Sequence, residues 1–388
     1  MRLLYKIFEI IYGLLLYYFS FIIKKDKNVW VFGAWFGKAY NDNSRYLFEY
    51  VSNNLKDIKA IWLSTDKEVI TYLNSLGYKA YHTYSLKGIY YSLKAYFGVV
   101  ITGKNDINRF VPPKYYINLW HGTPLKKIVY DDKFFRKKHS KLYRKIIYSI
   151  FMPYAKHNYN KNFYITARGE LEQKNLASAF NVELDRVWIT GLMRDSILFN
   201  SKEFNKEQTK IIYLPTHRNQ GTTKIEILSE ETFNKLDKKL KALNARLYIK
   251  LHFYHLKNLS FIDKFENIIF IKPNVDFDLY YFLKKIDILI TDYSSVFFDF
   301  LITQKPIIFF PYDLKDYLTK DRELYYDYNQ ITPGPKCKNW EEVFEWIEKF
   351  KTNPKLYEDD RKAIFEKFYK FKDDKAIERV LKCMKSLL

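Results

Sequence analysis

Short apolar segments alternate along this chain with longer segments in which apolar residues recur every three or four positions. The short segments predict strands at residues 29–33, 60–64, 80–82, 99–103, 115–120, 163–167 and 187–191, and again at residues 211–216, 246–252, 268–272, 288–291 and 306–310. The longer segments, such as residues 43–53 and 66–76, have the spacing of amphipathic helices. Strands and helices in alternation are typical of parallel βαβ units with helices on both faces of each sheet.

The alternation of strands and helices begins again after a polar stretch at residues 200–210. A chain of 388 residues is long for a single core and suits two domains of ordinary size. We therefore expect an α/β protein of two Rossmann-like domains that face a cleft, at residues 28–195 and 196–388. The helical pattern that follows Pro354 is assigned to the second domain.

An apolar segment at residues 7–23 contains a single charged residue, Glu9. Cations lie on both sides of this segment: Arg2, Lys6, Lys24, Lys25 and Lys27. Its length is about the minimum for a helix that spans a bilayer, and no small-residue cleavage site follows it. We expect residues 1–27 to form a membrane-associating helix that lies in the interface of an anionic bilayer. A spanning helix and a buried core helix are the alternatives.

The net charge of +21 predicts an anionic partner: nucleic acid, acidic lipid or a phosphorylated substrate. The most basic stretch, residues 126–145, has none of the features of a helix-turn-helix, an RRM or a zinc finger, so we expect no nucleic-acid partner. Its cations alternate with Phe and Tyr, which fits an anionic membrane surface or, equally, a solvated helix face. Cys337 and Cys383 lie far apart and predict neither a disulfide framework nor a zinc site, which favours a reducing cytoplasmic setting.

A histidine stands where the strand predicted at residues 115–120 stops. In open α/β sheets, ligands bind outside the carboxyl ends of the strands. A neutral imidazole at His121 can accept a proton at physiological pH, Gly122 allows close approach of the backbone, and the lysines that follow can hold an anion. The alternative is a structural histidine that is hydrogen-bonded to a neighbouring loop.

Polar groups also follow three strands of the second half, at residues 215–218, 250–252 and 292–295. Ser294 and Ser295 precede a helical pattern, and free N–H groups at a helix N-terminus bind phosphate oxygens. Asp299 lies one turn further on and can accept from a hydroxyl. Each group has an ordinary alternative, such as a helix cap or a solvent-facing side chain. His252 and His255 lack the glutamate of zinc peptidases, so we expect no metal site.

Several motifs together resemble one family. They are WHGTPLKK at residues 120–127, GLMRDSIL at 191–198, YLPTHR at 213–218, KLH at 250–252, TDYSSVFFDFLITQKPIIFFPYDLKDY at 291–317 and YYDYNQITPGP at 325–335. In order and spacing they resemble the CDP-glycerol glycerophosphotransferase family, the teichoic acid primases and polymerases. The resemblance implies a glycosyltransferase-B architecture and a membrane-associated enzyme at the cytoplasmic face of the bacterial plasma membrane.

The resemblance also implies the reaction and the roles of individual residues. Glycerol phosphate would pass from CDP-glycerol to a hydroxyl of a lipid-diphosphate-linked saccharide or a polyol-phosphate chain, with release of CMP and without a cofactor, in teichoic acid or capsule synthesis. His121 would be the general base, and His252 would neutralise or protonate the diphosphate side. Substrate binding would fall to Trp120, Gly122, Thr123, Pro124, Arg194, Pro215, Thr216, Lys250, Leu251, Ser294, Ser295 and Asp299. A CDP-ribitol or nucleotide-sugar donor is the alternative, and a non-enzymatic anion-binding protein is a third hypothesis.

Overall fold

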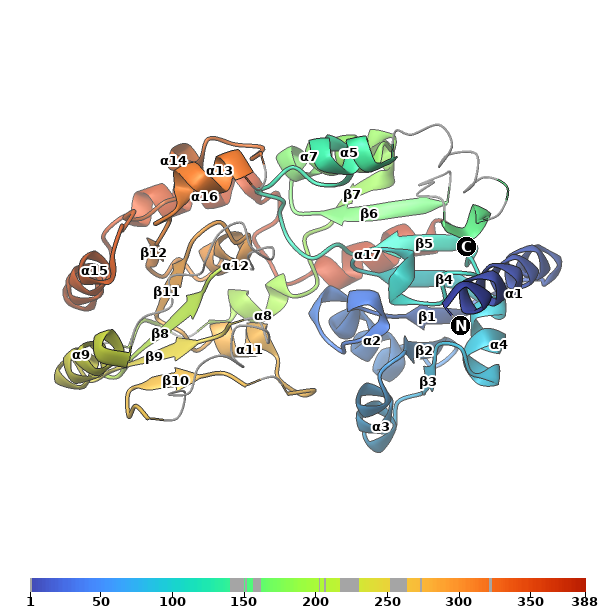
Figure 1. Ribbon diagram of the computed structural model, residues 1–388, viewed down its shortest axis with the longest axis horizontal. Coiled ribbons are helices and arrows are strands. Elements are labelled where there is room, and N and C mark those ends of the chain that lie inside the picture. Colours follow the sequence, from blue (N-terminus) through green and yellow to red (C-terminus); the bar gives the residue numbers. More distant parts are fainter. Residues whose placement is uncertain are drawn as a thin grey trace. The chain divides into compact units, whose positions relative to one another are not determined.

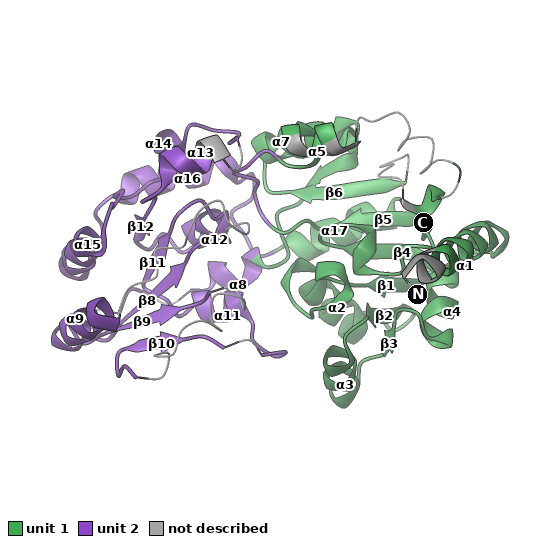
Figure 2. Cartoon of the chain, in the orientation of Figure 1, with its two compact units in different colours: residues 1–121, 128–194, 375–388 green, residues 122–127, 195–374 purple. Residues whose placement is uncertain are grey.

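The computed structural model describes residues 2–139, 150, 152–155, 162–201, 203–205, 207–216, 230–251, 264–272, 274–320 and 323–388. The chain forms two compact units, which Figure 2 shows in different colours. Unit 1 consists of residues 1–121, 128–194 and 375–388, and unit 2 of residues 122–127 and 195–374. The predicted cleft concerns the relative position of the two units and stays a prediction.

Unit 1 is built on a seven-stranded parallel sheet with the strand order β3-β2-β1-β4-β5-β6-β7 (Figure 1). Its strands are β1 (Asp26–Phe32), β2 (Lys59–Ser64), β3 (Ala80–His82), β4 (Ala95–Val100), β5 (Tyr115–Asn118), β6 (Phe163–Ala167) and β7 (Val187–Ile189). Its helices are α1 (Arg2–Ile22), α2 (Asp42–Asn54), α3 (Lys67–Ser75), α4 (Leu86–Lys94), α5 (Lys133–His139), α7 (Glu170–Phe180) and α17 (Ala376–Lys385), with 3-10 turns η1 (Trp35–Gly37), η2 (Lys104–Asp106), η3 (Val129–Asp131), η4 (Pro153–Ala155) and η5 (Leu184–Arg186).

The strands at the centre of this sheet are apolar because both of their faces are covered. All six residues of β4 are buried, and β4 pairs with both β1 and β5. The sequence predicted this strand at residues 99–103, whereas it begins at Ala95. Helix α4 runs directly into Ala95, so no turn residue marks the change, and pairing with two neighbouring strands decides the conformation.

Unit 2 contains a five-stranded parallel sheet with the strand order β10-β9-β8-β11-β12. Its strands are β8 (Thr209–Leu214), β9 (Ala245–Ile249), β10 (Ile268–Phe270), β11 (Ile288–Thr291) and β12 (Ile307–Phe309). Its helices are α8 (Asp195–Phe199), α9 (Glu230–Ala242), α11 (Leu279–Leu283), α12 (Val296–Leu301), α13 (Leu314–Lys320), α14 (Tyr328–Ile331), α15 (Trp340–Thr352) and α16 (Glu358–Phe368). The predicted α/β class with parallel sheets is confirmed in both units.

The last helix, α17, belongs to unit 1, although the sequence assigned residues 196–388 to the second domain. The side chain of Arg379 donates to the carbonyl of Thr190 at 2.8 Å, and the Tyr96 hydroxyl donates to the carbonyl of Leu387 at 2.8 Å. The helical pattern of this segment does not reveal the sheet on which it packs. Residues 122–127 likewise join unit 2, where the N–H of Lys127 donates to the carbonyl of Glu323 at 2.8 Å.

Helix α1 packs on unit 1 through one face only. Tyr12 and Tyr17 lie against a small apolar cluster of Phe110, Val111 and Tyr154, and a side chain in place of Gly13 would meet the Phe110 ring at 2.7 Å. The opposite face of α1 is exposed and apolar. Among the described residues, no helix combines the length and the apolar character that crossing a bilayer requires.

Candidate active site

The loop that carries His121 follows β5 at the carboxyl edge of the unit 1 sheet. The N–H of Trp120 donates to the side chain of Asn118 at 2.9 Å, and the Thr166 hydroxyl donates to the carbonyl of Leu119 at 2.8 Å. Trp120 has a φ of 53°, a left-handed conformation that is costly for a tryptophan. Gly122 follows with a φ of 127°, which only glycine adopts readily. Buried polar side chains thus hold a strained turn.

The imidazole of His121 is fixed in one orientation. Its Nδ1 lies 3.0 Å from the carbonyl oxygen of Ile101. Because a carbonyl can only accept, Nδ1 carries the hydrogen in the neutral ring and Nε2 keeps its lone pair. Burial lowers the pKa of His121 below its ordinary value of 6.5, while the carbonyl of Ile101 and the carboxylate of Asp42 act in the opposite direction. The ring is therefore neutral at pH 7, as a general base requires.

Two tryptophans lie beside the imidazole. The ring centroid of Trp120 is 4.0 Å from that of His121, and the centroid of Trp35 is 5.2 Å away. Trp35 belongs to η1, directly after β1, where Trp35 and Phe36 have φ values of 46° and 60°. Strained residues gathered at one sheet edge are typical of a functional site.

The carboxylate of Asp106 holds the η1 turn in place. It accepts from the N–H groups of Phe36 at 2.7 Å, Ile101 at 2.8 Å and Thr102 at 2.7 Å. Asp106 thus links the loop of Trp35 to Ile101, whose carbonyl orients His121. The backbone is so close at Gly33 that a Cβ there would lie 2.0 Å from the carbonyl oxygen of Asp106.

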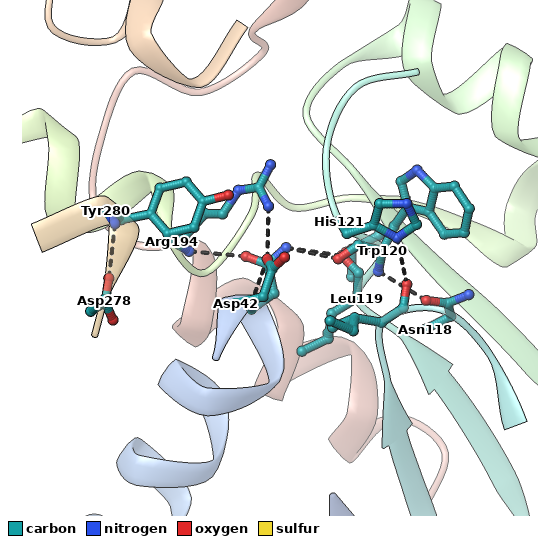
Figure 3. A network of polar contacts seen from close by, with 11 residues as sticks. Asp42, Asn118, Leu119, Trp120, His121, Arg194, Asp278 and Tyr280 are labelled. Carbon is teal, nitrogen blue, oxygen red and sulfur yellow. Dashed lines mark hydrogen bonds and ion pairs between the residues drawn. The ribbon is translucent and has the colours of Figure 1, made fainter. Parts of the chain in front are cut away.

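A buried ion pair lies close to the His121 loop (Figure 3). The guanidinium Nη1 of Arg194 lies 2.7 Å from Oδ1 of Asp42, and their side chains are 1% and 7% exposed. Asn43 completes the network: it donates to the carbonyl of Trp120 at 2.9 Å and accepts from the N–H of Arg194 at 3.0 Å. The start of α2 thus fastens the turn at residues 192–194 to the histidine loop. A donor contact by Arg194 stays a prediction.

Of the polar residues predicted at three strand ends of unit 2, those that the structure describes, at 215–216, 250–251 and 292–295, lie along one edge of its sheet. Strands β9, β8 and β11 are parallel neighbours, so the residues that follow them meet at the same edge. The N–H of Thr216 donates to Oδ1 of Asp292 at 2.8 Å, and the Thr291 hydroxyl donates to the carbonyl of Leu214 at 2.7 Å. Pro215 and Thr216 are therefore tied to the segment that contains Ser294 and Ser295.

The two serines are only weakly used as helix caps. The N–H of Val296 donates to the hydroxyl of Ser294 at 3.4 Å, and Ser295 makes no side-chain cap bond to α12. Both serines are half-buried, whereas Asp299 is buried within α12. Helix capping therefore gives little reason for two serines at these positions. That Ser294 and Ser295 bind phosphate stays a prediction.

Lys250 and Leu251 follow β9, and burial lowers the pKa of the Lys250 amine from its ordinary value. Within the 122–127 segment, Gly122, Thr123 and Pro124 are buried. His252, which the sequence predicts as a second catalytic residue, lies outside the described residues. In the described part of the chain, no cluster of three or more His, Cys, Asp or Glu side chains could hold a metal ion.

Residues 15–385 match the family model of CDP-glycerol:poly(glycerophosphate) glycerophosphotransferase. This chain belongs to that family. It is an enzyme of the glycerophosphotransferase type, and the family transfers polyol phosphate in teichoic acid synthesis. The resemblance found in the motifs is thereby confirmed.

Similar proteins support the assignment over nearly the whole chain. A teichoic acid glycerol-phosphate transferase of Staphylococcus aureus is 26% identical over 92% of this chain and 92% of its own. A teichoic acid poly(ribitol-phosphate) polymerase of Bacillus spizizenii is 29% identical over 59% of this chain and 38% of its own. The wall teichoic acid polymerase TagF has a similar fold, with a TM-score of 0.74 and 22% identity over 94% of this chain and 91% of its own. TagF has also been solved as a variant with CDPG, with a TM-score of 0.72 and 21% identity over 93% of this chain and 89% of its own.

Several residues of this glycerophosphotransferase that organise the site are not apparent in the sequence. Trp35, Asp42, Asn43 and Asp106 lie in segments that have no recognisable motif. Position was the available signal: Trp35 lies two residues after the strand predicted at residues 29–33, and Asp42 directly precedes the helix predicted at residues 43–53. Asn43 contacts the carbonyls of Leu119 and Trp120, which are 76 and 77 positions away, and Asp106 contacts Phe36, which is 70 positions away. Spacing along the sequence could not reveal these contacts.

Proposed function

We propose that this glycerophosphotransferase moves glycerol phosphate from CDP-glycerol to a hydroxyl of a lipid-diphosphate-linked saccharide or a growing polyol-phosphate chain. CMP is the leaving group, and the polymer is a teichoic acid or a capsule. The observation that carries the proposal is the neutral imidazole of His121, oriented by Ile101 with its Nε2 lone pair available at a strained sheet edge.

In this reaction the Nε2 of His121 accepts the proton of the acceptor hydroxyl. The oxygen attacks the phosphorus that bears glycerol, the bond from that phosphorus to the bridging oxygen breaks, and CMP leaves with the electron pair. The carboxyl edge of the unit 2 sheet holds the donor, with Ser294, Ser295 and Lys250 on its phosphates. Thr216, Arg194 and Asp299 support these groups, and His252 neutralises the diphosphate.

The proposal is tested with purified protein, labelled CDP-glycerol and a lipid-diphosphate disaccharide. We expect one CMP for each glycerol phosphate that enters the lipid fraction. CMP release without labelled lipid would show hydrolysis of the donor and would contradict transfer.

Ribitol phosphate is the second candidate for the transferred group, because ribitol-phosphate polymerases are among the similar proteins. The two donors differ only beyond the phosphate that is attacked, so the same base and the same phosphate contacts serve both. Competition distinguishes them: if CDP-ribitol displaces labelled CDP-glycerol at equal concentration and supports equal CMP release, glycerol specificity is wrong.

The pH dependence of the rate follows from the state of His121. The imidazole acts as a base only when it is neutral, and burial lowers its pKa below 6.5. The rate should therefore fall only below that value, so that the acid limb of kcat/KM has a midpoint below pH 6.5. A pH profile from 4.5 to 8 at constant ionic strength measures this midpoint. A midpoint above pH 7 would require a raised pKa and would contradict the assignment of the base.

We further propose that the protein lies on the cytoplasmic face of the plasma membrane through α1. Phe8, Ile11, Leu15 and Ile22 are 66%, 53%, 66% and 78% exposed, and their spacing places them on one face of the helix. An apolar face that is exposed in the described part of the chain, next to flanking lysines, suits a helix that lies in the lipid interface.

Replacing Leu15 with aspartate should therefore lower binding to vesicles by about tenfold or more, because a charge replaces a side chain that enters the apolar layer. Leu184→Asp is the matched control, since Leu184 is also an exposed leucine of unit 1, with 47% exposure, but lies away from α1 in η5. Co-sedimentation with lipid vesicles measures both variants. Equal binding by Leu15→Asp and wild type would refute the role of α1.

A further inference from the structure

Five lysines surround a hollow of about 720 Å³ at the amino edge of the unit 1 sheet. Its lining residues are Lys24, Lys25, Asp26, Lys27, Lys94, Tyr96 and Lys114. Asp26 is the single acidic side chain among them, and its carboxylate accepts from the N–H of Asn28 at 3.0 Å. Such a hollow attracts an anion, and its volume falls in the range of ordinary ligand pockets.

The lysines come from three separate segments that the sheet topology brings together. Lys24, Lys25 and Lys27 lie at the start of β1, Lys94 precedes β4, and Lys114 precedes β5. These three strands are parallel neighbours, so their amino ends share one edge. His121 follows the carboxyl end of β5, at the opposite edge. The hollow is therefore separate from the proposed catalytic loop.

Two of the five lysines donate hydrogen bonds within the described part of the protein, and the amine of Lys114 lies 6.0 Å from the centroid of the Tyr115 ring. The amine of Lys25 donates to the carbonyl of Pro112 at 2.8 Å, and the amine of Lys27 donates to the main-chain oxygen of Leu388. Burial lowers the pKa of Lys25 from 10.5 to about 8. An anion placed beside this amine would favour its charged form and offset the cost of burial.

The exposed apolar face of α1 leads directly to this hollow. Phe21 and Ile22, at the end of the helix, are 66% and 78% exposed, and Lys24 follows two residues later. A bilayer presents the same sequence of surfaces: an apolar layer, then phosphate groups at its border. A free phosphate ion would use the lysines but would leave the apolar face uncovered.

We propose that the hollow between α1 and the amino ends of β1, β4 and β5 binds the phosphate of an anionic membrane lipid while the exposed face of α1 enters the bilayer. This inference rests on the proposed membrane location and adds a defined headgroup site to it. The site positions unit 1 on the membrane by an edge of the sheet that the transfer reaction does not use.

The test is co-sedimentation of the full chain with phosphatidylcholine vesicles that contain one-fifth phosphatidylglycerol, at low ionic strength. The variant K24Q/K94Q/K114Q removes three lysines of the hollow and leaves the hydrogen bonds of Lys25 and Lys27 in place. The control K56Q/K67Q/K79Q removes the same charge from three exposed lysines of unit 1 outside the hollow. K24R/K94R/K114R keeps the charge.

We expect the hollow variant to bind these vesicles about a hundredfold more weakly, since each lysine at an anionic surface contributes about fivefold. The control should lose less than about fivefold, and the arginine variant should bind as the wild type does. Equal losses of vesicle binding in the hollow variant and in the control would show that binding depends on overall charge, and would overturn the proposed headgroup site. Displacement of the wild type from vesicles by millimolar inorganic phosphate would show that free phosphate is the ligand and would also overturn it.

The vesicle assay uses neither donor nor acceptor, so its result does not depend on the transfer reaction. Melting temperatures of the three variants, compared with the wild type, show that each is folded. CMP release with a water-soluble acceptor should be unchanged in the hollow variant. A wild type that binds vesicles but releases no CMP would contradict the proposed function and leave the headgroup site supported.

Discussion

Replacing His121 with asparagine is expected to lower kcat for CMP release by about 10²- to 10⁴-fold, the usual contribution of a general base. Asparagine can still donate to the carbonyl of Ile101, which the imidazole Nδ1 meets at 3.0 Å, so the loop keeps its anchor. What is lost is the Nε2 lone pair that takes the proton. Steady-state kinetics with saturating CDP-glycerol and a lipid acceptor measure the effect.

A matched control is His82→Asn, because His82 ends β3 at the edge of the same sheet and is half-buried. This variant should keep the wild-type rate. Calorimetry should show that His121→Asn binds CDP-glycerol with unchanged affinity, since the donor is assigned to unit 2. If His121→Asn keeps a rate within a few-fold of the wild type, His121 is not the general base.

Replacing Asp42 with asparagine is expected to lower the free energy of unfolding by about 3 kcal/mol or more, because it removes a negative charge that lies 2.7 Å from the buried Arg194 cation. Asp42 has a φ of 62°, which asparagine also tolerates, so the change removes the charge and spares the backbone. Urea unfolding measures the difference. Glu231→Gln, in the exposed pair with Lys235, is the control and should leave the midpoint unchanged.

The same variant has an effect on catalysis that a purely structural role would not produce. The carboxylate of Asp42 raises the pKa of His121, so its removal should lower that pKa further. The acid limb of the rate profile should then move to lower pH in Asp42→Asn. An acid limb that stays in place, or moves to higher pH, would show that the carboxylate of Asp42 does not raise the pKa of His121.

The strands were predictable because parallel strands covered on both faces are short apolar runs. Their polar ends were predictable for the same reason, since a polar residue after such a run marks the sheet edge. This reasoning placed His121, Thr216 and Ser294 at strand ends, where the structure has them. It indicated an anion and phosphate oxygens as ligands, but the identity of the donor and of the acceptor entered only through the resemblance to a family.

The contacts that organise the site could not be read from the sequence, because they join distant segments. Asp42 and Arg194 are separated by 152 positions. Arg194 lies in one of the family motifs, but nothing in the sequence marks Asp42 as its partner. The return of α17 to unit 1 depends on side chains such as Arg379, whose partner is a backbone carbonyl. Every residue has a backbone carbonyl, so the sequence does not show which carbonyl a side chain will contact.

We expect this chain to transfer a polyol phosphate from a CDP-linked donor. The most direct measurement is CMP or UDP release from CDP-glycerol, CDP-ribitol and UDP-glucose in parallel, with a lipid-diphosphate disaccharide as acceptor, for the wild type and His121→Ala. The wild type should release CMP from CDP-glycerol, this release should disappear in His121→Ala, and neither protein should release UDP. UDP release from UDP-glucose with no CMP release from either CDP-polyol would contradict this expectation.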